Sequence, residues 1–282
     1  MANEKYALLD TDFISKMHLI RRDDQNKLID KIIAMPNYSF YCHNQIKKEL
    51  LRHNIAGSLE WLEARISDGT ICLYDDKKIM DELSDIYGTS APAMYAQLMK
   101  TACDAYKAGY FEYKFVTLAN LDYSDIGLEE FLEKLEVNCN AIGEGQNLGE
   151  LKIYVLLQFL NIKLGQQIYV FCSDDKNARN GIVSIGGARC ISVLSSFLRL
   201  QKECGFSRED VEPYIQSYMK CCLGKDQITF RIQGTSKEKR LCRVACEQVF
   251  DDMFDGKLEE LKTGNLRYIQ QDVEENNKIY EM

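Results

Sequence analysis

Proline and histidine are scarce in this sequence, and long apolar runs are missing from it. Only three prolines and three histidines occur among the 282 residues. No run approaches the roughly 18 apolar residues of a membrane-spanning helix, so we expect no membrane partner. The N-terminus shows no basic segment followed by an apolar stretch, which predicts that there is no secretion signal and that the protein is cytoplasmic. With so little proline, no linker between domains is evident.

Several signatures of metal binding and catalysis are also absent. There is no CxxC pair, and the eleven cysteines are odd in number and lack the spacing of a disulfide framework. This pattern favours reduced thiols, most of them buried structural residues. Neither a glycine-rich phosphate loop nor a GxSxG sequence occurs, which argues against P-loop nucleotide chemistry and serine-dependent acyl transfer. Zinc sites and covalent acyl chemistry are therefore disfavoured.

Positive charge is in the minority, because the formal net charge is −8. Global charge therefore does not indicate a nucleic-acid partner, and any phosphate contact must come from a local basic segment. The densest such segment is RIQGTSKEKRLCR, residues 231–243. It is either the solvated start of a helix or a phosphate-binding segment. In the second case Lys237, Lys239 and Arg240 are the candidate contacts.

Short apolar runs with strand character alternate with helical periodicity through the first 200 residues. Such alternation predicts an α/β three-layer sandwich with a mostly parallel central sheet of about five strands. The runs are YALL (6–9), YSFYC (38–42), TICLY (70–74), QIYVFC (167–172) and RCISV (189–193). DDQNKLIDKIIA, residues 23–34, is expected to form a helix after the first of these runs.

The remaining segments suggest two additions to this scaffold. A polar helical insertion is expected at about 76–122, inside a first domain of residues 1–200. Residues 201–282 form a C-terminal α+β extension, expected to bind substrate or a partner. Within the extension we expect a helix capped by Ser207, a strand in QITFRIQ, and one long or two short helices over 237–262.

Acids follow two of the predicted strands directly. The sequence KYALLDTDFI places Asp10 and Asp12 after the first strand, and VFCSDDKNAR places Asp174 and Asp175 after the fourth. Ligands of parallel sheets bind at the carboxyl ends of strands. Carboxylates in such a place are costly unless they are paired or hold a cation. A capping role for these residues is the alternative interpretation.

Two further acids lie on helix faces that should be apolar. In NQIKKELLRH, Glu49 shares a side with Ile46 and Leu50, and in GELKIYVLLQ, Glu150 lies among apolar neighbours. Each acid also has an ordinary interpretation on its own. Glu49 could be a helix-edge residue, and Glu150 or Glu144 could interact favourably with the dipole at the start of a helix. Taken together, the acids favour a metal site. A ligand set made only of oxygen suits Mg²⁺ or Mn²⁺, which activate water for attack on phosphates.

At this point the chain resembles the PIN-domain family. YALLDTDFI is similar to the first motif of the family, NQIKKELL to its second motif, and IGEGQNLGELKIYVLLQFL to the start of the helix that carries its third acid. VFCSDDKNAR, followed by GGARCISVLSSFLRLQKECGFS, resembles the strand, acid pair, Arg-bearing helix and short last strand of one bacterial and archaeal subgroup. The resemblance covers roughly residues 5 to 205, with the motifs in order. The usual family member is about half this length and has neither the insertion nor the extension.

The resemblance implies a divalent-metal nuclease that hydrolyses phosphodiester bonds, most often in RNA. It assigns catalysis to Asp10, Glu49, Glu150 and Asp174, with Asp12, Asp175 and Glu144 as additional metal ligands; Glu144 and Glu150 are alternatives for the third carboxylate. Thr11 and Arg179 are expected to contact the nucleic acid. A homo-oligomer or a regulatory protein partner is left open.

Two rival functions stay open from the sequence. A haloacid-dehalogenase-like phosphatase also begins with a strand followed by Asp-x-Asp, and would use Asp10 as nucleophile and Asp12 as acid and base. That interpretation leaves Glu49 and Glu150 without a role. The other rival is a catalytically silent PIN-like module that binds RNA or a protein.

Overall fold

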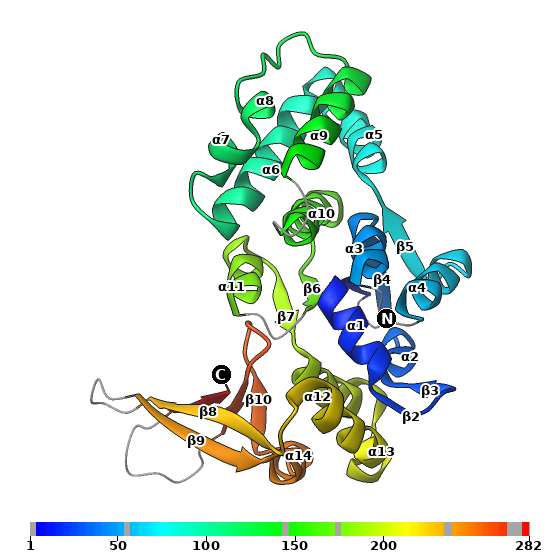
Figure 1. Ribbon diagram of the computed structural model, residues 1–282, viewed down its shortest axis with the longest axis vertical. Coiled ribbons are helices and arrows are strands. Elements are labelled where there is room, and N and C mark those ends of the chain that lie inside the picture. Colours follow the sequence, from blue (N-terminus) through cyan, green and yellow to red (C-terminus); the bar gives the residue numbers. More distant parts are fainter. Residues whose placement is uncertain are drawn as a thin grey trace.

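A five-stranded, all-parallel sheet lies at the centre of the computed structural model (Figure 1). The structure describes residues 4–53, 57–142, 147–172, 176–233, 239–269 and 278–281. The strand order β5-β4-β1-β6-β7 confirms the expected α/β class. All five strands coincide with the apolar runs: β1 (Lys5–Leu9), β4 (Tyr38–His43), β5 (Ile71–Tyr74), β6 (Ile168–Phe171) and β7 (Arg189–Ile191).

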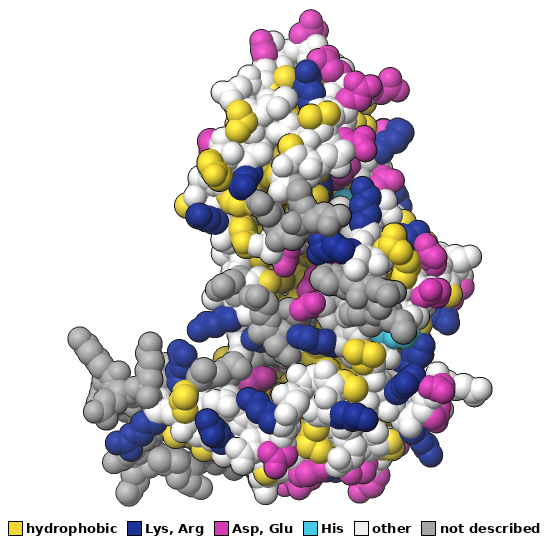
Figure 2. Space-filling model, viewed as in Figure 1, with side chains coloured by type: hydrophobic (Ala, Val, Ile, Leu, Met, Phe, Trp, Pro, Cys, Tyr) yellow, Lys and Arg dark blue, Asp and Glu magenta, His cyan; other side chains and the backbone are white. Residues whose placement is uncertain are grey.

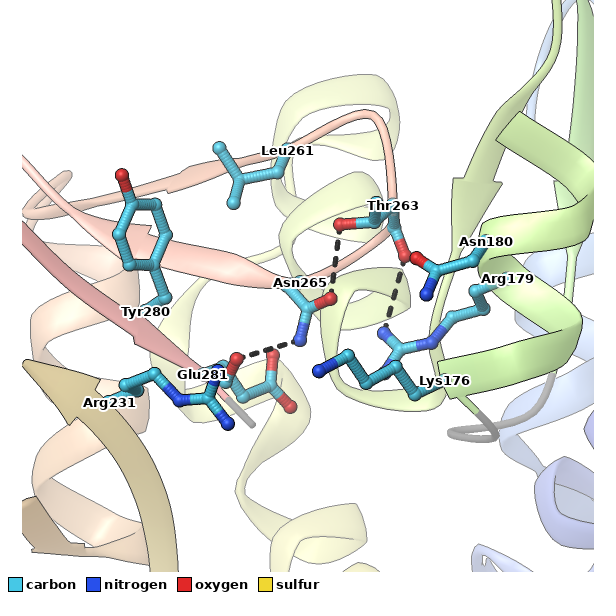
Figure 3. Close-up of a pocket in the computed structure, with 9 residues that line it drawn as sticks. All are labelled: Lys176, Arg179, Asn180, Arg231, Leu261, Thr263, Asn265, Tyr280 and Glu281. Atoms are coloured by element: carbon cyan, nitrogen blue, oxygen red, sulfur yellow. Dashed lines mark hydrogen bonds between the residues drawn. The ribbon is translucent and has the colours of Figure 1, made fainter. Parts of the chain in front are cut away.

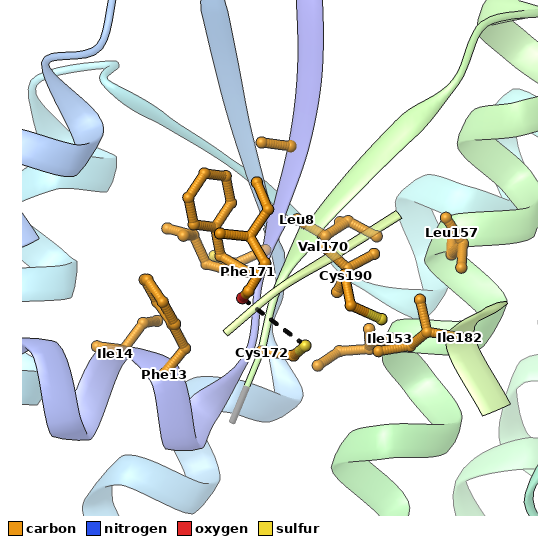
Figure 4. Close-up of a cluster of buried hydrophobic side chains, with 14 of the residues drawn as sticks. Leu8, Phe13, Ile14, Ile153, Leu157, Val170, Phe171, Cys172, Ile182 and Cys190 are labelled. Atoms are coloured by element: carbon orange, nitrogen blue, oxygen red, sulfur yellow. Dashed lines mark hydrogen bonds between the residues drawn. The ribbon is translucent and has the colours of Figure 1, made fainter. Parts of the chain in front are cut away.

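Helices cover both faces of this sheet, as a three-layer sandwich requires. Figure 4 shows Phe13 and Ile14 of α1 on one face, and Ile153 and Leu157 of α10 with Ile182 of α11 on the other. Burying such a side chain contributes roughly 1.5–3 kcal/mol. Against α1 (Thr11–Leu19) pack α2 (Leu28–Ile33) and α12 (Val193–Cys204), while α10 (Leu148–Leu164) and α11 (Lys176–Ser184) contact the strands from the opposite face.

The chain reverses its direction of progress across the sheet between β1 and β6. From β1 it moves outward through β4 to β5, and it later returns to the other side of β1 as β6 and β7. In open parallel sheets, the crevice at the carboxyl ends of two such strands is the usual ligand site. The other elements of this half are α3 (Gln45–His53), α4 (Ser58–Ser67) and a two-stranded ribbon of β2 (Arg21–Asp23) and β3 (Asn26–Lys27).

A helical region stands beyond the carboxyl edge of the sheet and forms one end of the molecule in Figure 1. Its longest helix, α6, begins at Ala91–Pro92, as expected for a proline at a helix start. The region consists of α5 (Asp76–Tyr87), a 3₁₀ turn (Gly88–Ser90), α6 (Ala91–Tyr106), α7 (Tyr110–Lys114), α8 (Val116–Ala119) and α9 (Leu128–Ile142). Helix α6 packs on α10, which joins the region to the sandwich. No helix in the described ranges is long and apolar enough to cross a membrane.

The C-terminal extension forms a second, antiparallel sheet with the order β10-β11-β12-β8-β9. Ser207 caps α13 (Arg208–Tyr218) through a capping box with Asp210, which confirms that expectation. A π turn (Met219–Leu223) leads to β8 (Gln227–Gln233), which confirms the strand expected in QITFRIQ. The remaining elements are β9 (Lys239–Ala245), α14 (Cys246–Phe254), β10 (Leu258–Glu260), β11 (Leu266–Tyr268) and β12 (Lys278–Glu281).

Two expected helices were wrong in their extent. The segment 237–262 is not one or two helices throughout, because Lys239–Ala245 pairs with β8 as a strand and only Cys246–Phe254 is helical. Along β9 the partly buried Cys242 and Val244 alternate with exposed neighbours, a two-residue period. The helix expected over 23–34 begins only at Leu28, because the residues before it form the β2–β3 ribbon.

The extension is anchored on the edge of the parallel sheet by the loop between β10 and β11. Cys190 of β7 donates its backbone N–H to Lys262 O at 2.8 Å, and the Ser192 hydroxyl donates to Gly264 O at 2.8 Å. Gly264 has a φ of +74°, and a Cβ there would lie 2.9 Å from Ser192 N. Only glycine fits this close approach, so the loop holds the two parts of the chain together.

Candidate functional site

Asp10 lies where the strand order reverses, between the carboxyl ends of β1 and β6. It follows β1 directly, and its backbone N–H donates to Phe171 O, at the end of β6, at 2.9 Å. Its carboxylate accepts from Thr11 N at 2.8 Å, so it is the N-cap residue of α1. The capping role considered from the sequence is thus confirmed. It uses one carboxylate oxygen only and leaves the other available for further interactions.

Negative charge gathers around Asp10 from three other positions. Its pKa is raised from 3.8 to about 8 by burial first, and then by the charges of Glu150, Asp12 and Glu49. The hydrogen bond from Thr11 N acts in the opposite direction and is outweighed. Among the described residues, the charged groups that most affect Asp10 are therefore all carboxylates. Four of the acids selected from the sequence meet here, from the end of β1 and from α1, α3 and α10.

Glu49 is held toward the site by two features of its surroundings. The Thr11 hydroxyl donates to Glu49 Oε2 at 2.6 Å. On the other side, Gly149 at the start of α10 lies so close that a Cβ there would be 2.3 Å from Glu49 Oε1. Any larger residue at position 149 would displace the carboxylate. Sequence reasoning missed Gly149; the available signal was a glycine within the first turn of a strongly apolar helix.

Glu150 and Asp12 differ in exposure. Glu150 is half-buried in the first turn of α10, and Ile153, Tyr154 and Leu157 beside it are buried, as the helical projection predicts. The side chain of Asp12 is 60% exposed, and its Oδ2 lies 3.9 Å from Lys16 Nζ. Asp12 therefore adds negative charge from the rim of the site, while Asp10 forms its buried end.

Several predicted metal ligands and phosphate contacts lie outside the part of the chain that the structure describes. Glu144, Asp174, Asp175 and Lys237 lie outside the described residues, and of Lys239 only the backbone is described. Within the described ranges, no group of three or more His, Cys, Asp or Glu side chains is arranged so that it could hold a metal ion. The donors around Asp10 are all oxygen atoms, which suits a hard cation such as Mg²⁺ or Mn²⁺ and not a thiophilic one.

The residues expected to contact nucleic acid lie in different surroundings. Thr11 is 5% exposed, and its hydroxyl is used by Glu49. Arg179 is buried on α11, and its guanidinium donates to Thr263 O in the β10–β11 loop at 3.3 Å. Arg240 is exposed on β9. Figure 2 shows acidic side chains in the middle of this face, between the helical region and the C-terminal sheet, flanked by Lys and Arg side chains.

A second buried charge cluster, missed from the sequence, lies where the helical region meets α10. Lys152, 1% exposed, is 2.8 Å from each carboxylate oxygen of Asp76 on α5. The Tyr95 hydroxyl also donates to Asp76, and His43 Nε2 lies 3.3 Å from it. Burial alone would raise the pKa of Asp76, but Lys152 and His43 outweigh it and lower that pKa. In this cluster a lysine lies directly against the buried carboxylate.

No family model, no curated protein and no solved structure matches this chain.

Proposed function

We propose that the protein is a divalent-metal-dependent nuclease that hydrolyses phosphodiester bonds in RNA. One observation carries the proposal: carboxylates from separate elements meet at the carboxyl edge of a parallel sheet, and their charges act together on Asp10. Carboxylates brought together in this way are costly for folding unless they are paired or hold a cation. Such a site favours the binding of a cation or the uptake of a proton.

The donor set supports Mg²⁺ or Mn²⁺ as that cation. The proposed ligands are Asp10, Glu49 and Glu150, with Asp12 at the rim. Because the described acids alone form no group that could hold a metal ion, the proposal also needs ligands from Asp174, Asp175 and Glu144, which lie outside the described residues. When bound, the ion would supply charge stabilisation for the phosphate and a more acidic water. Because Asp10 is protonated below about pH 8 in the absence of a cation, binding must release its proton.

The chain's own residues prepare this arrangement. Thr11 orients Glu49 by donating its hydroxyl, and Gly149 leaves room for the carboxylate. Asp10 is fixed by its capping bond to Thr11 N and by the link to Phe171. Side chains positioned in this way lose little entropy when they bind a ligand, which favours a preorganised site.

RNA is proposed as the substrate because of the family resemblance of the first 205 residues, and the extension is proposed to position its phosphates. In this proposal Lys237, Lys239 and Arg240 contact the phosphates. Lys239, whose backbone pairs with Gln233, and Arg240 belong to β9, and Lys237 lies outside the described residues. The haloacid-dehalogenase-like phosphatase gives no role to Glu49, whereas the nuclease uses it. No observation favours the silent binding module over the enzyme.

The test combines metal binding with cleavage. We expect calorimetric titration to detect Mn²⁺ binding to the wild-type protein, and Asp10→Asn and Glu49→Gln to weaken it and abolish cleavage of single-stranded RNA. Asp85→Asn, an exposed acid on α5, is the matched control and should leave both intact. If Mn²⁺ does not bind, or if Asp10→Asn cleaves like the wild type, the proposal is wrong. A phospho-aspartate trapped with a phosphomonoester substrate would replace it by the phosphatase.

A further inference from the structure

A cavity of about 310 Å³ lies between α11 and the C-terminal sheet, outside the acidic site (Figure 3). Lys176 and Arg179 of α11 line one side of it, and Arg231 of β8 with Tyr280 and Glu281 of β12 line the other. Ligand cavities span roughly 300–1,000 Å³, so this one is at the small end and suits a single nucleotide unit.

Cationic side chains outnumber acidic ones around this cavity. Lys176, Arg179 and Arg231 face it together with only one carboxylate among the described residues, that of Glu281. In Figure 3 the Lys176 and Arg231 side chains approach the cavity from opposite walls. Arg231 Nε is buried and has no hydrogen-bond partner in the part of the chain that the structure describes. In a chain with a net charge of −8, such a local excess of positive charge is suited to a phosphate.

The cavity walls are also braced. Arg179 donates to Thr263 O at 3.3 Å, the Thr263 hydroxyl donates to Asn265 Oδ1 at 3.0 Å, and Asn265 Nδ2 donates to Glu281 O at 2.8 Å. These bonds connect α11, the β10–β11 loop and β12 into one frame. The Tyr280 side chain adds an aromatic face, on which a nucleobase can stack.

The position of the cavity relates it to the acidic site. Lys176 is the first residue of α11, which follows β6, and β6 is the direct neighbour of β1 in the sheet. Both sites therefore include residues that follow the carboxyl ends of β1 and β6. The cavity exists only because the extension packs here, since most of its lining residues, among them Arg231, Thr263 and Tyr280, belong to residues 201–282.

We propose that this cavity binds one nucleotide of a single-stranded RNA. It would hold a phosphate other than the cleaved one between Lys176 and Arg231, and a base on Tyr280. The inference rests on the proposed nuclease function for its biological meaning, but the binding itself needs no metal. The extension would therefore anchor the substrate strand beside the acidic site.

The experiment measures binding of a labelled single-stranded RNA to the full chain in EDTA, by fluorescence anisotropy. We expect the double variant Lys176→Ala, Arg231→Ala to raise Kd about tenfold or more. The slope of log K against log salt should become shallower by about 0.7 for each phosphate that is no longer neutralised. Arg22→Ala, an exposed arginine of the distant β2, is the control and should change neither. Tyr280→Leu should weaken binding roughly 5- to 150-fold without changing the salt slope.

Competition separates a strand from a free nucleotide. A nucleoside monophosphate should weakly displace the labelled RNA from the wild-type protein. It should displace even less of the RNA that is bound to the double variant. If the monophosphate binds but does not compete with RNA, the cavity serves a free nucleotide and the strand assignment is wrong.

The outcome is independent of catalysis. If the wild type cleaves RNA with Mn²⁺ while the folded double variant keeps its Kd and salt slope, the cavity proposal fails and the nuclease stands. If the wild type cleaves nothing while the double variant binds RNA more weakly, the nuclease fails and the cavity stands. Circular dichroism and thermal melting of each variant establish that it is folded.

Discussion

Lys152 Nζ lies 2.8 Å from both carboxylate oxygens of Asp76, and this ion pair joins α10 to the helical region. Its two residues belong to segments separated by 76 positions in the chain. Glu150 is two residues before Lys152 on the same helix, so the pair also fixes the helix that carries one of the site acids. The buried pair thus stabilises the helix that carries one acid of the site.

Removing this lysine should be strongly destabilising. Lys152→Met leaves the Asp76 carboxylate without its main cation, and we expect a loss of about 3–5 kcal/mol in the free energy of unfolding. The exposed pair Lys77–Asp81 provides the control, because Lys77→Met should cost less than about 1 kcal/mol. Adding Asp76→Asn to Lys152→Met should recover part of the loss. Urea denaturation measures all of these, and equal costs at the two lysines would contradict the expectation.

The contribution of Asp10 to the stability of the metal-free protein should fall as pH rises across the range between about 4 and 8. Asp10 has a pKa of about 8 in the folded protein and 3.8 as its ordinary value. Between these values the folded state binds a proton that the unfolded state has lost, so raising the pH favours unfolding. In EDTA, the thermal midpoint of Asp10→Asn should depend less on pH than that of the wild type. The same pH dependence of the midpoint in the wild type and in the variant would argue against this pKa.

Mn²⁺ should reverse that trend. Because the cation competes with the Asp10 proton, its affinity should increase from pH 6 to pH 8 and its binding should release protons. Calorimetry in buffers with different ionisation enthalpies measures the number of protons released. Binding without proton release at pH 6 would contradict a ligand role for Asp10.

A methyl group at position 149 should act through Glu49. A Cβ there would lie 2.3 Å from Glu49 Oε1, and the flexible carboxylate can move aside at little cost to folding. We expect Gly149→Ala to change stability by no more than about 1 kcal/mol, since alanine also favours the helix. Metal affinity should nevertheless fall about 10- to 100-fold.

A double-mutant cycle tests that interpretation. In a Glu49→Ala background, Gly149→Ala should have no further effect on metal affinity, because the displaced group is gone. Gly127→Ala, where a Cβ meets nothing within 4 Å, is the control and should leave metal binding unchanged. Additive effects of the first two substitutions would show that Gly149 acts elsewhere.

The Thr11 hydroxyl should be needed for the position of Glu49 and not for the fold. Thr11→Val removes the donor at 2.6 Å from Glu49 Oε2 and should cost about 0.5–1.5 kcal/mol in stability. The expected loss in Mn²⁺ affinity is again about 10- to 100-fold. Thr11→Ser keeps the donor and should restore affinity. Equal affinities in the valine and serine variants would exclude the positioning role.

Local patterns were sufficient for the parallel sheet, because its strands are short apolar runs separated by helical periodicity. Leu8, Phe40 and Val170 are buried in runs that read as strands without any tertiary information. The same local logic failed over 237–262, where charged residues at helical spacing belong to an exposed strand paired with β8. Pairing between distant segments decided that structure, and local propensity did not.

The site was predictable in part for a related reason. Asp10 and Glu49 are acids that interrupt an apolar pattern, and such interruptions can be recognised in the sequence alone. The closeness of Gly149 to Glu49, and the meeting of Lys176 with Arg231, depend on how α10 packs against α3 and on how the extension folds back. These contacts join segments that are far apart in the sequence, so they cannot be inferred from the spacing of residues.

The β10–β11 loop determines whether the parallel-sheet part of the chain can be produced without the extension. β7 is the outermost strand of the parallel sheet, and Lys262 O accepts the Cys190 N–H on its open side. A bare outer strand of this kind is a template for pairing with other molecules and so promotes aggregation. A fragment ending near residue 205 would uncover it, and we expect such a fragment to precipitate where the full chain stays monodisperse. The extension thus covers part of the outer strand of the sandwich and should protect it from pairing with other molecules.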